Sequence, residues 1–308
     1  MAEFQGIIAA LGPVFALVMM GYGCRRFNFP GEGFWPLAER FVYYLLFPSL
    51  LVYKLATTQM SELPVTAAVI SIVLLLLLTS VLALVLAKIL KLTGPAISSF
   101  YQGGVRFNTY VGLAAAGELY GDLGLLWGAL FVAVMIPLVN VCCIAVFSML
   151  SAGGGENRLR GLWLGLVKNP LIIACVIGIT LNLSGIGLPL GTEPVLALLS
   201  PVALPLGLLA VGVGLDLKTL TKSGLGLWVC CLFKLVLYPV IFFVIAHGLG
   251  VDKSAMAVLL VFALLPTAPS AYILAKQLGG DAPMMAAIIT LQTLLAMLTM
   301  PFMLLLLN

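Results

Sequence analysis

The sequence has little charge of either sign. Only 8% of its 308 residues are charged, whereas 63% are hydrophobic. A water-soluble domain of this length needs charged side chains over its surface, so the composition excludes that class and indicates a membrane protein. The net charge of +4 is small and scattered along the chain, and we therefore expect no nucleic-acid partner.

Residues that usually carry enzyme chemistry are also scarce. His247 is the one histidine, which excludes a zinc site built from histidines and a His-based triad. The six cysteines show neither metal-ligand nor disulfide spacing, and five of them lie inside apolar runs. We expect no enzyme activity, no catalytic residue, no metal and no cofactor.

What the sequence does contain is a series of apolar runs. Each is roughly 20 residues long, enough to cross a hydrocarbon core about 30 Å thick. The first has no basic segment before it and no cleavage pattern after it, so we interpret it as a retained span. The sequence thus predicts an all-α integral membrane protein with ten transmembrane helices, at about 5–23, 35–54, 64–88, 96–118, 122–149, 161–183, 193–215, 223–247, 254–278 and 283–307.

The lysines and arginines in the connections predict the orientation. If the N-terminus lies outside, the outer loops hold only Lys54 and Lys253. The inner loops and their flanks hold Arg25, Arg26, Lys88, Lys91, Arg158, Arg160, Lys168, Lys218, Lys222 and Lys276. Because basic residues concentrate on the inner side, this bias favours both termini outside and an even number of spans.

Three sequence pairs indicate an internal repeat. Pro48 and Pro205 lie in similar apolar helices 157 residues apart, and Gly121-Asp122 and Gly280-Asp281 lie 159 apart. "VMIPLVN" (134–140) and "LTMPFML" (298–304) form a looser third pair in the same order. Each unit has five spans, an odd number, so the second copy enters the membrane inverted, as in many secondary transporters. We predict repeats at 1–153 and 161–308, joined by a short cytoplasmic linker at 154–160.

The fourth span of each repeat has a polar, irregular middle. Span 4 reads "YQGGVRFNTYVG" and span 9 reads "LLPTAPSAY". Proline removes backbone donors and glycine loosens a helix, so both spans are predicted to break near the bilayer centre. The half-helices that restart there point free N–H groups at the centre, which suits an anion. The candidate substrate-binding residues are Arg106, Asn108, Thr109, Tyr110, Asn140, Pro266, Thr267, Pro269, Ser270 and Gln292.

Several of these residues have two readings. Arg106 either attracts a carboxylate or pairs within the helix bundle. Asn140 and Gln292 either line the pocket or form hydrogen bonds between helices. Lys234, inside span 8, has no obvious acidic partner in sequence, and its role stays open.

Three segments carry a family resemblance. "RFNTYVGLAAAGELYGD", "LPTAPSAYILAKQLGGD" and "LQTLLAMLTMPFMLLLL" resemble the auxin efflux carrier family in its bacterial branch. The resemblance implies crossing broken helices 4 and 9, a scaffold of helices 1, 2, 6 and 7 that forms a homodimer, and a transport domain of helices 3–5 and 8–10. It also implies small organic anions as substrates, an elevator mechanism and a bacterial inner membrane.

Two other functions compete with transport of an organic anion. A membrane sensor or scaffold could use the same fold to bind a lipid or metabolite. Such a protein is expected to carry an appended domain, whereas this sequence ends at Asn308, soon after the tenth span. A membrane enzyme would need a cluster of nucleophile, base or metal ligands, which the sequence does not show.

Overall fold

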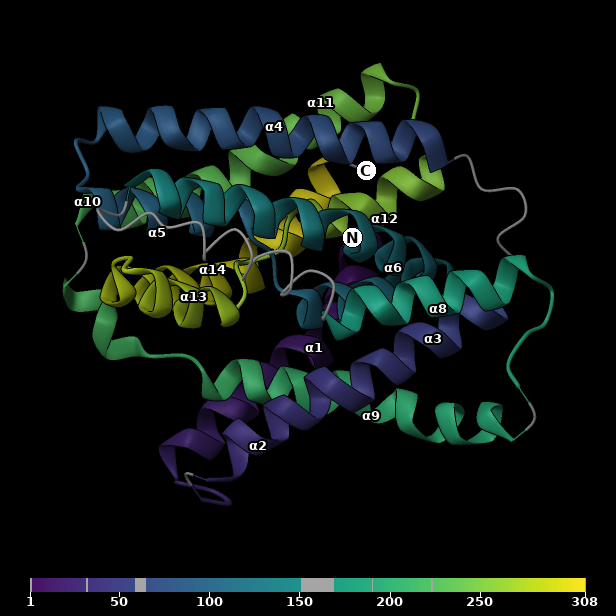
Figure 1. The fold of residues 1–308 in the computed structure, drawn as a ribbon. Coiled ribbons are helices and arrows are strands. Elements are labelled where there is room, and N and C mark those ends of the chain that lie inside the picture. The colour runs from purple at the N-terminus through teal and green to yellow at the C-terminus, as the bar shows by residue number, and fades with distance from the viewer. Residues whose placement is uncertain are drawn as a thin grey trace. The chain divides into compact units, whose positions relative to one another are not determined.

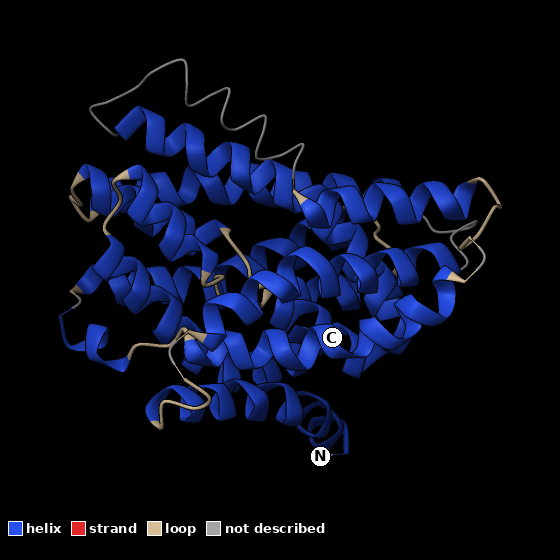
Figure 2. Cartoon of the chain, turned by 60° about the horizontal axis from the view of Figure 1, so that its bottom comes forward, coloured by secondary structure: helices blue, strands red, loops and turns tan. Residues whose placement is uncertain are grey.

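A computed structural model describes residues 2–31, 33–58, 65–150, 169–189, 191–222 and 224–307. Within these ranges every regular element is helical and no strand occurs (Figure 2). The prediction of an all-α protein is therefore confirmed. The predicted linker at 154–160, with Arg158 and Arg160, lies outside the described residues.

Six helical segments in the described part are long and apolar enough to cross a membrane: Phe4–Arg26, Val65–Ile89, Gly94–Leu150, Thr192–Val213, Leu225–Gly248 and Ala282–Leu307. Segment Gly94–Leu150 covers two of the predicted spans, and the remaining predicted spans correspond to shorter helices. These helices make the chain an integral membrane protein, whereas ten spans in two inverted repeats stay a prediction.

The chain divides into two compact units. Unit 1 consists of residues 1–64, 109–134 and 165–214, and unit 2 of residues 65–108, 135–164 and 215–308. The helices of unit 1 are α1 (Ala2–Arg26), α2 (Phe34–Phe41), η1 (Val42–Leu46), α3 (Phe47–Thr57), α8 (Pro170–Leu183), α9 (Thr192–Val213) and the first part of α6 (Thr109–Leu150) (Figure 1).

Unit 2 holds the last part of α6 and most of the second half of the chain. Its other helices are α4 (Val65–Ile89), α5 (Gly94–Val105), η2 (Leu217–Lys222), α10 (Leu225–Leu232), η3 (Phe233–Leu237), α11 (Tyr238–Gly248), α12 (Lys253–Ala263), α13 (Ser270–Leu278) and α14 (Ala282–Leu307).

Unit 1 is held together by close packing of α1 against α9 and of α3 against α8 (Figure 1). A Cβ atom on Gly212 of α9 would lie 1.8 Å from the carbonyl oxygen of Val18 in α1. Glycine is therefore required at this crossing, because small residues let membrane helices bring their backbones together. A Cβ on Gly178 of α8 would similarly lie 2.7 Å from the Leu55 side chain in α3.

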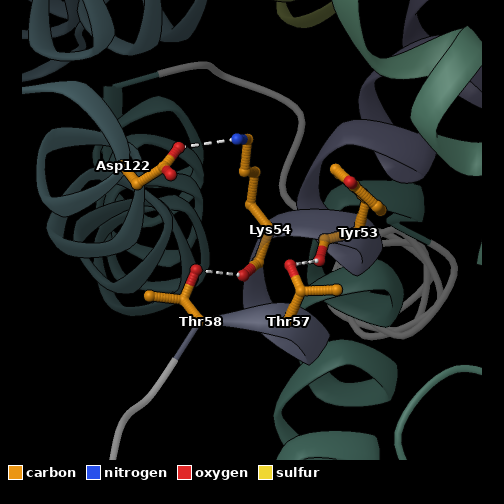
Figure 3. A network of polar contacts seen from close by, with 5 residues as sticks. All are labelled: Tyr53, Lys54, Thr57, Thr58 and Asp122. Atoms are coloured by element: carbon orange, nitrogen blue, oxygen red, sulfur yellow. Dashed lines mark hydrogen bonds and ion pairs between the residues drawn. The ribbon is translucent and has the colours of Figure 1, made fainter.

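A side-chain amide caps the C-terminal end of α3. The Asn182 side-chain amide donates to the carbonyl oxygens of Leu55 at 2.8 Å and Thr58 at 2.6 Å, which satisfies carbonyls that a helix end leaves without partners. In the same region the Lys54 Nζ atom lies 2.6 Å from Asp122 Oδ1 in α6 (Figure 3). This ion pair links the end of the second predicted span to the region where the fourth and fifth meet.

Helix α6 contains the predicted boundary between spans 4 and 5. Two helices meet within the segment Thr109–Leu150, and Gly121, with φ 59° and ψ −138°, forms the kink between them. Residues with a side chain rarely adopt this backbone conformation. A single glycine thus turns the chain where the repeat partner, Gly279-Gly280-Asp281, separates two helices.

Unit 2 packs α5 tightly among its neighbours. A Cβ on Gly103 would lie 2.7 Å from Ile288 Cγ2 and 2.9 Å from Cys230 Sγ, and one on Gly104 would lie 2.9 Å from the Phe233 ring. Two consecutive glycines therefore let α5 approach α14, α10 and η3. The C-terminal end of α5 sits at the centre of this unit.

Two short π-helical segments precede prolines. Segment η1 ends one residue before Phe47-Pro48, and η3 ends one residue before Tyr238-Pro239. A proline inside a helix lacks an N–H and clashes with the carbonyl four residues earlier. The wider turn accommodates that clash, so both segments have a local cause in the sequence.

The structure agrees with the absence of disulfide spacing in the sequence. All six thiols are free, with Cys143, Cys175, Cys230 and Cys231 buried and Cys24 and Cys142 partly exposed.

Asp252 caps the N-terminal end of α12. Its carboxylate accepts hydrogen bonds from the Ser254 side chain and from the backbone N–H of Ala255. These bonds hold the pKa of the Asp252 carboxyl below its usual range and cap the helix.

Candidate functional site

The first helix break lies between α5 and α6, within the predicted span 4. Helix α5 ends at Val105, Arg106 is extended with φ −73° and ψ 158°, and α6 begins at Thr109. No proline is present here, so Gly103 and Gly104 in the last turn and Asn108 before the restart are the local features that favour the break. The interruption falls where the sequence predicted it.

The second break lies between α12 and α13, within the predicted span 9. Helix α12 ends at Ala263, and α13 begins at Ser270 with Pro269 as its N-cap residue. Pro266 and Pro269 have no backbone N–H, and each restricts the residue before it to extended backbone. The helix therefore stops before Pro266 and restarts directly after Pro269.

The two breaks are joined to each other inside unit 2. The backbone N–H of Asn108 donates to the carbonyl oxygen of Pro266 at 2.8 Å. The Thr267 hydroxyl donates to the carbonyl oxygen of Gln102, in the last turn of α5, at 3.3 Å. Asn108 and Thr267 are fully buried. The break after α5 and the break after α12 thus form one structure, with Asn108, Pro266 and Thr267 at its centre.

Gln292 of α14 stabilises both breaks. Its side-chain oxygen accepts from the Thr267 N–H at 2.9 Å, and its Nε2 donates to the Gly103 carbonyl oxygen at 3.0 Å. Both ends of the amide are therefore engaged by backbone, and the side chain is fully buried. Of the two readings left open by the sequence, the structure places Gln292 in helix-to-helix hydrogen bonding.

Arg106 projects from the first break toward neutral partners. Its guanidinium donates to Asn140 Oδ1 in the last part of α6, and Nη1 lies 3.5 Å from the Ser270 hydroxyl at the start of α13. Its Nε atom is buried without a hydrogen-bond partner in the described part of the chain. The ion pair found among the described residues joins Lys54 and Asp122, so Arg106 has no acidic partner there.

The remaining predicted residues are divided between the two units. Pro269 is partly exposed and Ser270 is exposed, both at the start of α13 in unit 2. Thr109 and Tyr110 belong to unit 1. There the Tyr110 ring lies 4.6 Å from the ring of Phe47, edge to face, and a Cβ on Gly207 would come within 2.7 Å of it. The contacts described for Tyr110 are thus aromatic packing within unit 1.

The sequence reasoning passed over Gln102. Its side chain is fully buried in α5, and neither amide atom has a hydrogen-bond partner among the described residues. The signal was present in the sequence as a glutamine one turn before Arg106, inside a predicted membrane span. Buried polar groups of this kind are normally paired, so Gln102 has hydrogen-bonding capacity to spare.

These groups are suited to binding a small anion. A guanidinium held by neutral acceptors keeps its positive charge uncompensated, and its planar fork matches a carboxylate. Among the described residues, no group of three histidine, cysteine or acidic side chains is placed to hold a metal ion. The arrangement offers recognition of charge rather than a nucleophile or base.

Comparison with known proteins finds similarity to membrane transport proteins. Residues 157–304 match the family described as membrane transport protein. The chain is also 27% identical to a protein of Rhizobium meliloti (strain 1021) named "Putative malonate transporter", over an alignment that covers 97% of this chain and 94% of that relative. Together with the long apolar helices, these matches confirm the resemblance carried by the sequence motifs: about half of the chain, residues 157–304, matches the membrane transport protein family, and nearly its whole length aligns with a relative named as a transporter.

Proposed function

We propose that this protein is a secondary transporter that moves a small organic anion, a mono- or dicarboxylate or an auxin-like acid. The anion would bind at the paired helix breaks, near Arg106, Asn108 and residues 266–270. The membrane would be a bacterial inner membrane, with both termini outside. The positive bias of the inner loops supports this orientation, and Lys54 and Asp122, both assigned to the outer side, form an ion pair.

The observation that carries the proposal is the environment of Arg106. A charged side chain within a membrane span is costly and usually functional. Here the guanidinium contacts an amide and a hydroxyl, and its buried Nε has no partner in the described residues. A carboxylate would supply the missing negative charge and the missing acceptor together. Unwound backbone at membrane depth is tolerated where it lines such a site.

The proposed mechanism follows from the two repeats predicted by the sequence. Helices 1, 2, 6 and 7 of the predicted ten would form a fixed, dimeric scaffold, and helices 3–5 and 8–10 would carry the anion across in an elevator motion. Both breaks would then move with their ligand as one body. The hydrogen bond from Asn108 to Pro266 supports that view, because it ties the breaks directly together.

Uptake by the purified protein in liposomes tests the proposal. The substrates would be labelled mono- and dicarboxylates, beginning with malonate because of the relative's name. We expect saturable uptake of at least one of them. Arg106→Gln removes the charge and should weaken the apparent affinity for the anion about tenfold or more, since hydrogen bonds to charged groups contribute about 1.5–3 kcal/mol. Arg40→Gln, at an exposed position of α2, is the matched control and should leave uptake unchanged.

Binding without transport would favour the competing function, a sensor or scaffold in the same fold. In that case the protein would bind a carboxylate in detergent, with Arg106→Gln weakening the binding, yet liposomes would neither accumulate nor exchange label. Uptake that Arg106→Gln leaves unaltered would exclude the proposed site. The first outcome would refute transport but keep the binding site, and the second would refute the binding site but keep transport.

A further inference from the structure

Lys234 is a fully buried lysine in η3 of unit 2. Its relative exposure is 0%, and Nζ has no hydrogen-bond partner in the described part of the chain. The Nζ atom instead lies 3.6 Å from the ring centroid of Tyr238, one turn further along. An aromatic face stabilises an ammonium but does not neutralise it.

The helices packed against η3 provide no negative charge. They are α5, α10, α11 and α14, and none of these described helices contains an aspartate or glutamate. Their titratable groups are Tyr101, Cys230, Cys231, Tyr238 and His247. Arg106 follows the end of α5, and Asp281, before α14, uses its carboxylate to cap the N–H of Met284 at 2.9 Å. Among the described residues, an ammonium at Lys234 therefore has no counter-ion of its own.

Lys234 lies in the same packed core as the helix breaks. Cys230, one turn before it, receives a hydrogen bond from Gln292 Nε2 at 3.7 Å, and Gln292 also bonds both breaks. Phe233, the neighbour of Lys234, lies against Gly104 at the end of α5. A short chain of contacts thus connects the buried amine to the site proposed for the anion.

We propose that Lys234 is the proton-binding site through which transport is coupled to proton movement. Burying an ammonium without a counter-ion is costly, and a bound anion nearby supplies the missing negative charge. The amine and the anion therefore load together: R–NH₂ takes a proton from water on one side as the carboxylate enters, and both leave on the other side. This inference rests on the proposed transport of an anion and adds its coupling ion.

Other titratable residues are less suited to this role. Glu118 in α6 and Lys276 in α13 are exposed to solvent, so neither depends on a bound anion for a counter-charge. The buried thiols of Cys230 and Cys231 are acids, whose ionised form would add negative charge where the substrate is already anionic. Lys234 alone among these gains a positive charge when protonated within the core.

The first test uses the wild-type protein in weakly buffered detergent solution with a pH indicator. Adding malonate should cause uptake of a proton from the solution for each anion bound, and the Lys234→Met variant should bind malonate with no such uptake. Malonate binding by the wild type without proton uptake would overturn the proposal. This measurement does not depend on how well any variant is inserted into liposomes.

The second test measures two modes of transport in liposomes. In exchange, labelled malonate outside replaces unlabelled malonate inside with no pH gradient; in net uptake, an inward proton gradient drives accumulation. We expect Lys234→Met to retain exchange and to lose acceleration by the gradient, together with the acidification seen by an internal pH dye. Lys253→Met, at an exposed residue that begins α12, is the control and should keep both modes.

The outcomes distinguish this inference from the function on which it rests. If the wild type exchanges no carboxylate at all, the proposed transport is wrong. If it exchanges malonate and Lys234→Met still accumulates it faster with the gradient, transport stands and the coupling role of Lys234 is refuted. Tyr238→Phe, which keeps the aromatic face, should preserve coupling, whereas Tyr238→Leu should shift the pH at which net uptake is fastest.

Discussion

Gly21 of α1 and Leu209 of α9 touch through their backbones. A Cβ atom on Gly21 would lie only 2.0 Å from the carbonyl oxygen of Leu209. Together with the contact between Gly212 and Val18, this fixes α1 against α9 along one line of small residues, in the manner of small-residue packing between membrane helices.

Gly21→Ala should therefore destabilise unit 1. The added methyl group cannot be placed without moving one helix, and overpacking of this kind costs about 1–3 kcal/mol. Gly12→Ala in the same helix is the matched control, because nothing lies within 4 Å of its Cβ position, and it should be neutral or stabilising by about 0.5–1 kcal/mol. Thermal unfolding in detergent measures both; equal melting temperatures would contradict the described crossing.

Gln292→Leu should destabilise the paired breaks. The substitution leaves the N–H of Thr267 and the carbonyl of Gly103 buried without their partner, and each such group costs about 1–3 kcal/mol. Gln292→Glu, as a neutral buried acid, keeps an acceptor for Thr267 and an O–H donor for Gly103, so it should destabilise the breaks less than Gln292→Leu. Gln277→Leu, at an exposed position of α13, controls for the change in composition. Hydrogen exchange of the Thr267 amide would report the local loosening directly.

Replacing Pro266 and Pro269 together with alanine should join α12 and α13. Proline disfavours a helix interior by about 3 kcal/mol relative to alanine, so removing both takes away the local cause of the break. We expect the bond from Asn108 to Pro266 to be lost and uptake to stop while the protein stays folded. Pro283→Ala, at an exposed position in the first turn of α14, should leave uptake intact. Full activity in the double variant would show that transport does not need an interrupted helix.

The pair Lys54 and Asp122 should contribute little to stability. The Asp122 side chain is 74% exposed and that of Lys54 is 23% exposed, and exposed ion pairs contribute about 0.2–1 kcal/mol. A double-mutant cycle with Lys54→Met and Asp122→Asn should give a coupling energy in that range, and it should shrink in high salt. A coupling well above that range would show that the pair is shielded from water when the protein is in a membrane.

The breaks could be predicted from sequence because their causes are local. Pro266 and Pro269 lack the N–H groups that a continuous helix needs, and Gly103-Gly104 ends two residues before Arg106. The boundary between spans 4 and 5 also has a local cause. The Gly-Asp pair at 121–122 marks it in the sequence, and the positive φ of Gly121 interrupts the helix there.

Long-range partners could not be predicted in this way. Gln292 bonds Gly103 across 189 residues, and Lys54 bonds Asp122 across 68. A polar residue in an apolar helix signals that a partner exists without saying which, so Gln292 and Arg106 each kept two readings. The absence of an acidic residue in the described helices around Lys234 could not be predicted either, because α5 and α14, which pack against η3, come from distant parts of the sequence.

The burial of most cysteines has a practical consequence for testing whether this protein undergoes the motion proposed for transport. Four thiols lie within the protein interior, and only Cys24 and Cys142 are partly exposed. Serine at those two positions should give a nearly silent background for maleimide dyes and nitroxide spin probes. Probes introduced in pairs could then report, by the distances between them, whether adding malonate changes the arrangement of the labelled helices.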